Sequence, residues 1–193
     1  AAIDPGIDHA PNWGGVAIPD DSYFDMVRPG LLVYGYPPVE DRVYAVPVNA
    51  VMELDTSVVF LKRVKKGESI SYGRIWTADR DTTVATLPLG YADGLQRRLS
   101  GKLSVRIGES TYPVVGRICM DQMMVNIEWD SAYNGDVVTL LGEADGESIP
   151  AEDLAGWAGT IPYEILTNIN TRVPRVYLTE DKQPYMESSQ PVS

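Results

Sequence analysis

Three short segments place tyrosine or arginine side chains beside glycines within otherwise apolar stretches. The first is Ser71-Tyr72-Gly73, which follows the polar turn at Lys65–Glu68. A phenol has an ordinary pKa of about 10, so it serves as a general base near neutrality only beside cationic groups. The residues alone leave two interpretations open: Tyr72 is a general acid/base, or it is a half-buried aromatic side chain at a strand edge.

The other two segments combine glycines with charged side chains. Gly90–Arg98 reads Gly-Tyr-Ala-Asp-Gly-Leu-Gln-Arg-Arg, and Gly116–Gln122 reads Gly-Arg-Ile-Cys-Met-Asp-Gln. Each also has a purely structural interpretation. The first could form a hairpin with a solvated basic tip, and the second a bulge whose Asp121 pairs with an arginine.

The composition argues against several other kinds of site and partner. The chain contains one histidine, His9, and one cysteine, Cys119, so it cannot assemble the usual structural zinc site or an intrachain disulfide. The net charge is −11 and no basic stripe is present, which argues against binding to nucleic acid. No apolar run approaches the roughly 18–20 residues that cross a membrane. We therefore predict a cytoplasmic protein with neither a metal site nor a membrane anchor.

Predicted strands must position these segments. The apolar run Leu31–Tyr34 lies between Pro29-Gly30 and Gly35, which predicts a short buried strand. Within residues 103–107, apolar side chains alternate with Ser104 and Arg106 at a period of two, as in a half-buried strand. From about residue 49, short runs between polar turns predict a barrel or sandwich. The runs are Val51–Val64, Thr82–Leu89, Leu103–Ile107, Tyr112–Ile118, Met123–Ile127, Val137–Leu141 and Val173–Leu178.

Two short helices are expected near the end of the chain. Residues 148–159 have Pro150 suited to the first turn and Gly159 suited to the stop. One face of this helix would carry Ala151, Leu154, Ala155 and Ala158. A second helix is expected over Pro162–Asn168, and the polar residues 181–193 predict a loose tail.

In this order and at these separations, the motifs resemble the carboxy-terminal half of a pyridoxal-phosphate-dependent alanine racemase. Ser71-Tyr-Gly73, Gly90–Gly94 and Gly116–Gln122 are similar to motifs of that family's carboxy-terminal domain. Further matches are Phe24–Leu31 (Phe-Asp-Met-Val-Arg-Pro-Gly-Leu), which is similar to the last barrel strand, and Ile161–Glu164 with Thr171–Arg175 near the end. The resemblance covers about residues 9–178.

The resemblance implies a mainly β fold: a carboxy-terminal β-barrel-like domain with a small helical insert, preceded by the last strand region of a (β/α)8 barrel. It divides the chain into residues 1–40, the end of that barrel and a linker; residues 41–180, the all-β domain; and the tail at 181–193. Because the sequence begins Ala-Ala-Ile without an initiating Met, we expect a piece of a longer chain.

The resemblance also implies an activity, the interconversion of L-alanine and D-alanine in a bacterial cytoplasm to supply D-alanine for peptidoglycan. Two acid/bases on opposite faces of the substrate move the α-proton, and pyridoxal phosphate is the electron sink. In the family one base is the cofactor's lysine. The other is the tyrosine that matches Tyr72, which acts across a homodimer interface on the partner's cofactor.

Other positions acquire roles only by matching the family's motifs. Arg28 matches the arginine at the pyridine nitrogen, and the amides of Gly30 and Leu31 and the side chain of Tyr163 match phosphate contacts. The amide of Met120 matches a donor to the substrate carboxylate. Residues of the access route to the site are matched by Tyr91, Arg97, Arg117 and Ile161.

The sequence departs from the family pattern in ways that matter. Trp13 follows Asn12 where the family has a phosphate-contacting serine, and Pro29 replaces an apolar side chain. No lysine lies in the context of the family's cofactor anchor, so we expect residues 1–193 to be inactive alone. Two alternatives are a racemase of other specificity (serine or broad-range) and a non-catalytic β-rich interaction module.

Overall fold

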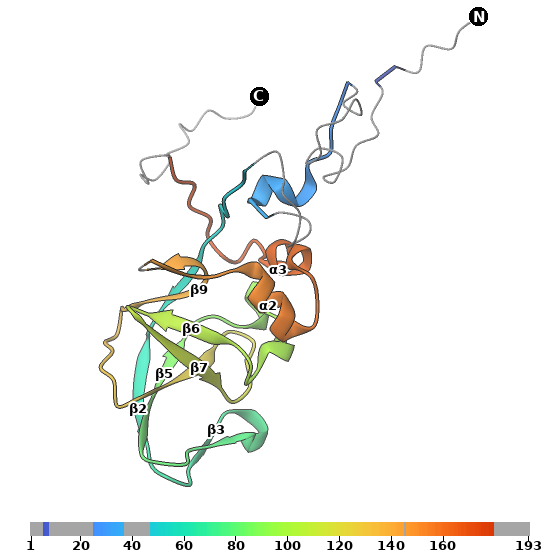
Figure 1. Ribbon diagram of the computed structural model, residues 1–193. Helices are drawn as coiled ribbons and strands as arrows, with labels where there is room; N and C mark the ends of the chain where they lie inside the picture. The colour runs from blue at the N-terminus through green and yellow to red at the C-terminus, as the bar shows by residue number, and fades with distance from the viewer. Residues whose placement is uncertain (1–5, 8–24, 37–46, 145, 180–193) are drawn as a thin grey trace, which may run out of the picture.

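The computed structural model describes residues 6–7, 25–36, 47–144 and 146–179. Their main feature is an eight-stranded antiparallel sheet in the order β1-β9-β6-β7-β8-β5-β2, with β10 paired to β9 (Figure 1). The strands are β1 (Leu54–Ser57), β2 (Phe60–Val64), β5 (Thr82–Leu87), β6 (Ser104–Ile107), β7 (Ser110–Val115), β8 (Met123–Glu128), β9 (Val137–Ala144) and β10 (Glu147–Ile149).

The sheet curls into a half-barrel around a large hydrophobic core, and a smaller cluster of Val64, Ala78, Val84 and Val115 is packed separately. Along β8 the burial alternates at a period of two, with Met123, Val125 and Ile127 buried. The register shifts in β1 and again in β5, and such irregularities bend a strand and increase its twist. The mainly β fold with a small helical insert, expected from the resemblance, is confirmed.

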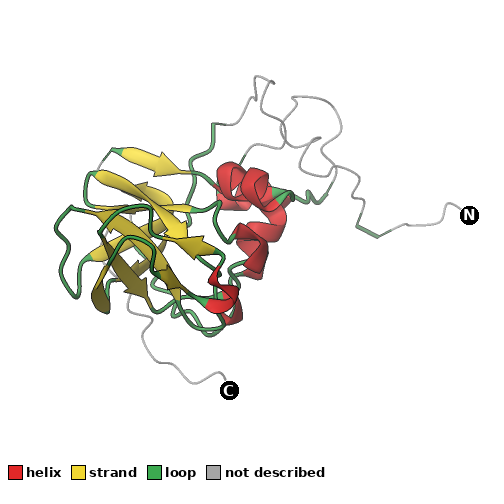
Figure 2. Ribbon diagram, turned by 90° about the horizontal axis from the view of Figure 1, so that it is seen from below, coloured by secondary structure: helices red, strands yellow, loops and turns green. Residues whose placement is uncertain are grey.

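Both predicted helices are present as α2 (Ala151–Ala158) and α3 (Pro162–Asn168). They lie together on one side of the strands (Figure 2). The predicted apolar face of α2 is buried, and Gly159 caps the end of the helix as expected. The predicted start at residue 148 is wrong, because Ser148 and Ile149 belong to β10 and Pro150 is the amino-terminal cap. The described residues include no helix that is both long and apolar enough to cross a bilayer.

A separate two-stranded sheet projects from the end of the half-barrel that lies away from α2 and α3 (Figure 1). It consists of β3 (Ser69–Ile70) and β4 (Trp76–Thr77), which are joined by the 3-10 turn η2 (Tyr72–Arg74). This β3–β4 hairpin carries the Ser-Tyr-Gly motif at its tip.

Two of the predicted strands are wrong. Residues Gly30–Tyr34 form a 3-10 helix, η1, because Pro29 has a helical backbone and Gly35 closes the turn with a left-handed one. Only Leu31 of this helix is buried. Residues 173–178 form no strand apart from an isolated bridge at Leu178, and the apolar side chains of residues 176–178 are exposed.

Two further strand predictions need correction. The run 51–64 is divided into β1 and β2 at Val58 and Val59, where Val58 exchanges backbone hydrogen bonds with the 133–136 loop. Arg106 alternates with apolar residues in the sequence, yet it is buried. It forms an ion pair with Glu147 of β10 and donates to the carbonyl of Gly108, so its two terminal nitrogens are paired although the side chain is buried.

Some predictions fall outside the described residues. These include His9, Asn12 and Trp13, most of the linker, and the tail at 181–193. The domain boundaries at 40 and 180 stay predictions.

One glycine gives a direct test of how tightly the loops pack. Gly94 has φ +109, and an added Cβ would lie 2.0 Å from the carbonyl oxygen of Asn168. Gly101 has φ +71, but its Cβ would meet nothing within 4 Å. We expect Gly94→Ala to lower the free energy of unfolding by about 3 kcal/mol, and Gly101→Ala by about 1 kcal/mol, in denaturant titrations. Equal losses for the two variants would contradict the close approach.

Candidate active site

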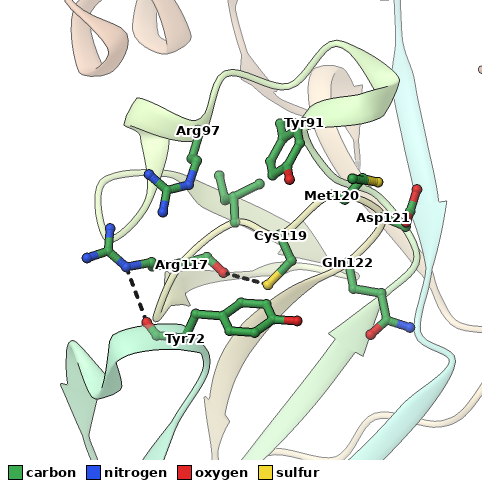
Figure 3. Close-up of a pocket in the computed structure, with 9 residues that line it drawn as sticks. Tyr72, Tyr91, Arg97, Arg117, Cys119, Met120, Asp121 and Gln122 are labelled. Atoms are coloured by element: carbon green, nitrogen blue, oxygen red, sulfur yellow. Dashed lines mark hydrogen bonds between the residues drawn. The ribbon is translucent and has the colours of Figure 1, made fainter.

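The three segments singled out in the sequence meet around one hollow of about 440 Å³ (Figure 3). They come from the β3–β4 hairpin, the β5–β6 connection and the β7–β8 connection. The lining residues are Tyr72, Tyr91, Arg97, Arg117, Ile118, Cys119, Met120, Asp121 and Gln122. Residues far apart in the sequence are thus brought together by the antiparallel pairing of β5 with β8.

Tyr72 lies at the tip of the β3–β4 hairpin, and its side chain is 74% exposed. The alternative of a half-buried aromatic at a strand edge is therefore wrong. The Nε of Arg117 donates a hydrogen bond of 3.2 Å to the carbonyl oxygen of Tyr72. This bond ties the hairpin to the β7–β8 connection while the phenol is left accessible.

The Gly90–Arg98 segment does not form a hairpin. It contains the 3-10 turns η3 (Tyr91–Asp93) and η4 (Arg97–Leu99). The amide of Tyr91 donates to the carbonyl of Cys119, and the amide of Ala92 donates to that of Met120, both at 3.0 Å. These bonds hold the Tyr91 turn against the loop that carries Met120.

Arg172 also connects the turn that contains Tyr91 to the β7–β8 connection. Its guanidinium lies 2.6 Å from Oδ1 of Asp121 and 3.4 Å from Oδ1 of Asp93, whose other oxygen accepts a hydrogen bond from the amide of Gly90. The bond to Asp121 raises the pKa of the Arg172 guanidinium above its ordinary value. Of the structural alternative for Gly116–Gln122, the pairing of Asp121 with an arginine is present, with Arg172 as the partner, but the segment is the β7–β8 connection rather than a bulge.

The positive charge of the lining suits a small anionic ligand, and the exposed Tyr72 phenol offers a group that can transfer a proton to it or from it. Arg97 and Arg117 bring two positive charges, while the only carboxylate of the lining, Asp121, is paired with Arg172. This local excess of positive charge stands out in a chain whose net charge is −11. No group of His, Cys, Asp and Glu that could hold a metal ion occurs within the described part of the chain.

The structure brings together half of the predicted site residues: Tyr72, Tyr91, Arg97, Arg117 and Met120. The others do not line this hollow. Gly30 and Leu31 begin η1, where the Leu31 side chain is buried in the core. Tyr163 on α3 is partly buried against the same core, Ile161 caps α3 and is exposed, and Arg28 precedes η1.

Three lining residues were not predicted from the sequence, although all lie within the Gly116–Gln122 motif: Ile118, Cys119 and Gln122. Arg172 was not predicted either, and it is 51 residues from Asp121 in the sequence. The Thr171–Arg175 match near the end of the chain was the available signal for this residue.

The fold and the hollow together define a curled β domain whose connecting loops present polar side chains to a ligand site. The family model described as the carboxy-terminal domain of alanine racemase matches residues 51–177. The alanine racemase of Treponema denticola is 49% identical over 189 residues, which are 95% of this chain and 49% of that protein. The chain therefore belongs to the alanine racemase family.

Solved structures agree with this assignment. The alanine racemase of Bacillus anthracis with bound L-Ala-P superposes with a TM-score of 0.89 at 33% identity, covering 95% of this chain and 47% of that one. The alanine racemase of Bartonella henselae with covalently bound pyridoxal phosphate gives a TM-score of 0.78 at 34% identity, covering 87% and 46%. The chain thus spans about half the length of these relatives.

Proposed function

We propose that this chain is the carboxy-terminal half of an alanine racemase, an isomerase that interconverts L-alanine and D-alanine. The family membership and the names of the relatives support the reaction, and the hollow supports the part that this half plays in it. The alternatives, a racemase of other specificity and a β-rich interaction module, become outcomes of the test below.

The observation that carries the proposal is the accessible phenol of Tyr72 beside two arginines. A tyrosine that serves only the core would be buried, whereas this side chain is 74% exposed at the tip of a hairpin whose backbone is hydrogen-bonded to Arg117. Held in this way, the phenol is suited to transfer a proton to or from a substrate that lies in the hollow.

The residues of this hollow fit the substrate side of a pyridoxal phosphate site but not its covalent anchor. No lysine lines the hollow, and Lys102 instead donates to the carbonyl of Trp157. The anchor then has to come from the half that this chain lacks relative to the family. Arg28, Gly30, Leu31 and Tyr163 are our candidates for contacts with the ring and the phosphate. When bound, the cofactor supplies the electron sink for α-proton removal.

The chain's own groups would have three roles. Arg97 and Arg117 attract the carboxylate of an incoming amino acid, since guanidinium groups bind carboxylates through charge-assisted hydrogen bonds. The backbone amide of Met120, in the loop held by Tyr91 and Ala92, donates to that carboxylate. The Tyr72 hydroxyl gives a proton to one face of the α-carbon or takes one from it.

We further propose that the enzyme is a homodimer with shared active sites, in which Tyr72 serves the partner's cofactor. The family resemblance implies this arrangement, and the accessible position of the phenol allows it. We also predict that the product D-alanine serves as a precursor of peptidoglycan and that the enzyme is located in a bacterial cytoplasm.

The test compares residues 1–193 with the full-length enzyme. We expect the 193-residue chain to show no borohydride-sensitive absorption band with pyridoxal phosphate and no racemisation, because no lysine lines its hollow. We expect the full-length enzyme to racemise alanine with a higher kcat/KM than serine, measured by chiral chromatography. Turnover by residues 1–193 alone would contradict the proposal. Preference for serine would point to the other specificity, and an inactive full-length protein to the interaction module.

A further inference from the structure

Ser71, the residue before the proposed acid/base, has an unusual backbone conformation. Its φ is 65° and its ψ is 172°, a region that glycine occupies almost exclusively. A serine persists there only if the surrounding structure holds it. Strained backbone of this kind clusters at functional sites.

The contacts that hold Ser71 come from one segment across the hollow. Its hydroxyl accepts a hydrogen bond of 2.9 Å from the amide of Arg117 and lies 3.1 Å from the carbonyl oxygen of Arg117, to which it donates. The side chain of Arg117 then donates to the carbonyl of Tyr72. A single hydroxyl thus satisfies both backbone groups of a residue that is 46 positions away.

The neighbouring Gly116 leaves the room that this contact needs. Gly116 has φ +72, and a Cβ at this position would lie 2.6 Å from the Cβ of Ser71. The strained serine, its two hydrogen bonds and the glycine opposite therefore belong to one contact, which docks the β3–β4 hairpin onto the β7–β8 connection.

Because Tyr72 is exposed, this contact is important for the position of its phenol. A side chain that is 74% exposed is held little by packing, so its backbone has to fix the place of the phenol. Proton transfer is sensitive to such placement, because an error of about 1 Å can cost a reaction on the order of 100-fold.

We propose that Ser71 is a positioning residue for the reaction, which sets the place of the Tyr72 phenol through its hydrogen bonds to Arg117. The inference rests on the proposed role of Tyr72 in proton transfer. Ser71 itself does not touch the substrate.

Two variants of the full-length enzyme test this role. Ser71→Ala removes the hydroxyl and keeps the strain, while Ser71→Gly removes the hydroxyl and adopts the same backbone without strain, so at least one is expected to fold. We expect both to lower kcat for alanine by about 10- to 100-fold with KM nearly unchanged. Ser69→Ala is the matched control, because it removes a hydroxyl that bonds only to Thr77 within the same hairpin. Its kcat should stay at the wild-type value.

A double-mutant cycle separates positioning from a general structural role. If Ser71 acts through the phenol, adding Ser71→Gly to Tyr72→Phe should lower the rate by less than about twofold. A folded Ser71→Gly enzyme with normal kcat would overturn the inference. The inference would also be overturned if Ser71→Gly lowered kcat by the same factor in the Tyr72 and the Tyr72→Phe enzymes. That result would leave the proposed function intact. A Tyr72→Phe enzyme with normal rates would overturn the proposed role of Tyr72 in proton transfer and this inference with it.

Discussion

Tyr72→Phe in the full-length enzyme should lower the rate of racemisation by about 10²–10⁴-fold, the usual contribution of a general acid/base. The substitution removes one oxygen and its proton and keeps the ring. Because the ring is largely exposed, we expect the thermal midpoint to be nearly unchanged. The loss should also differ between the two faces of the substrate. Exchange of the α-proton with deuterium oxide, followed by NMR, should survive better from the enantiomer that the lysine deprotonates.

Tyr133→Phe is the matched control for this experiment. Tyr133 is also exposed, at 72%, but it lies on the loop between β8 and β9 and does not line the hollow. Its rates should match those of the wild-type enzyme. Near-normal rates for Tyr72→Phe in both directions would end the catalytic interpretation of this residue.

The elements that were predicted best from the sequence are those whose burial follows a local periodic pattern of apolar residues. The face of α2 repeats at the helical period, so its buried side follows from local order. The strand β8 similarly shows its inward face in the alternation of its apolar residues. These predictions required no knowledge of which strand pairs with which.

The wrong predictions depended on partners that a local pattern does not contain. The apolar run at 31–34 suits a buried strand, but no strand pairs with it among the described residues, and the flanking Pro29 and Gly35 close it into a 3-10 turn. Arg106 is buried because Glu147, from a strand 41 residues away, pairs with it. A missing strand partner and the flanking residues decided the first case, and tertiary pairing decided the second.

The candidate site was predictable through motifs rather than through geometry. Tyr91 and Arg117 carry no mark of function in composition or periodicity, and resemblance to a family supplied their roles. The contacts that organise the hollow, those of Ser71 and Arg172, join segments more than 45 residues apart. Such contacts become visible only when the fold is known.

Mixing two inactive variants should restore activity if the active sites are shared between subunits. One variant is Tyr72→Phe, and the other lacks the cofactor lysine of the upstream half. In a mixed dimer one site then receives both defects, while the other combines an intact lysine with an intact phenol. Random reassociation makes half of the dimers mixed, so activity should reach about a quarter of the wild-type value.

Dissociation and reassociation of the subunits, followed by an alanine racemisation assay, would measure this recovery. Each variant carried through the same treatment alone is the control and should stay inactive. If the phenol served its own subunit's cofactor, every site in every dimer would lack either the lysine or the phenol, and mixing would restore nothing. The Tyr72 phenol is exposed at the tip of the β3–β4 hairpin, so it can reach a cofactor held outside the described residues, and the mixing experiment decides which subunit holds that cofactor.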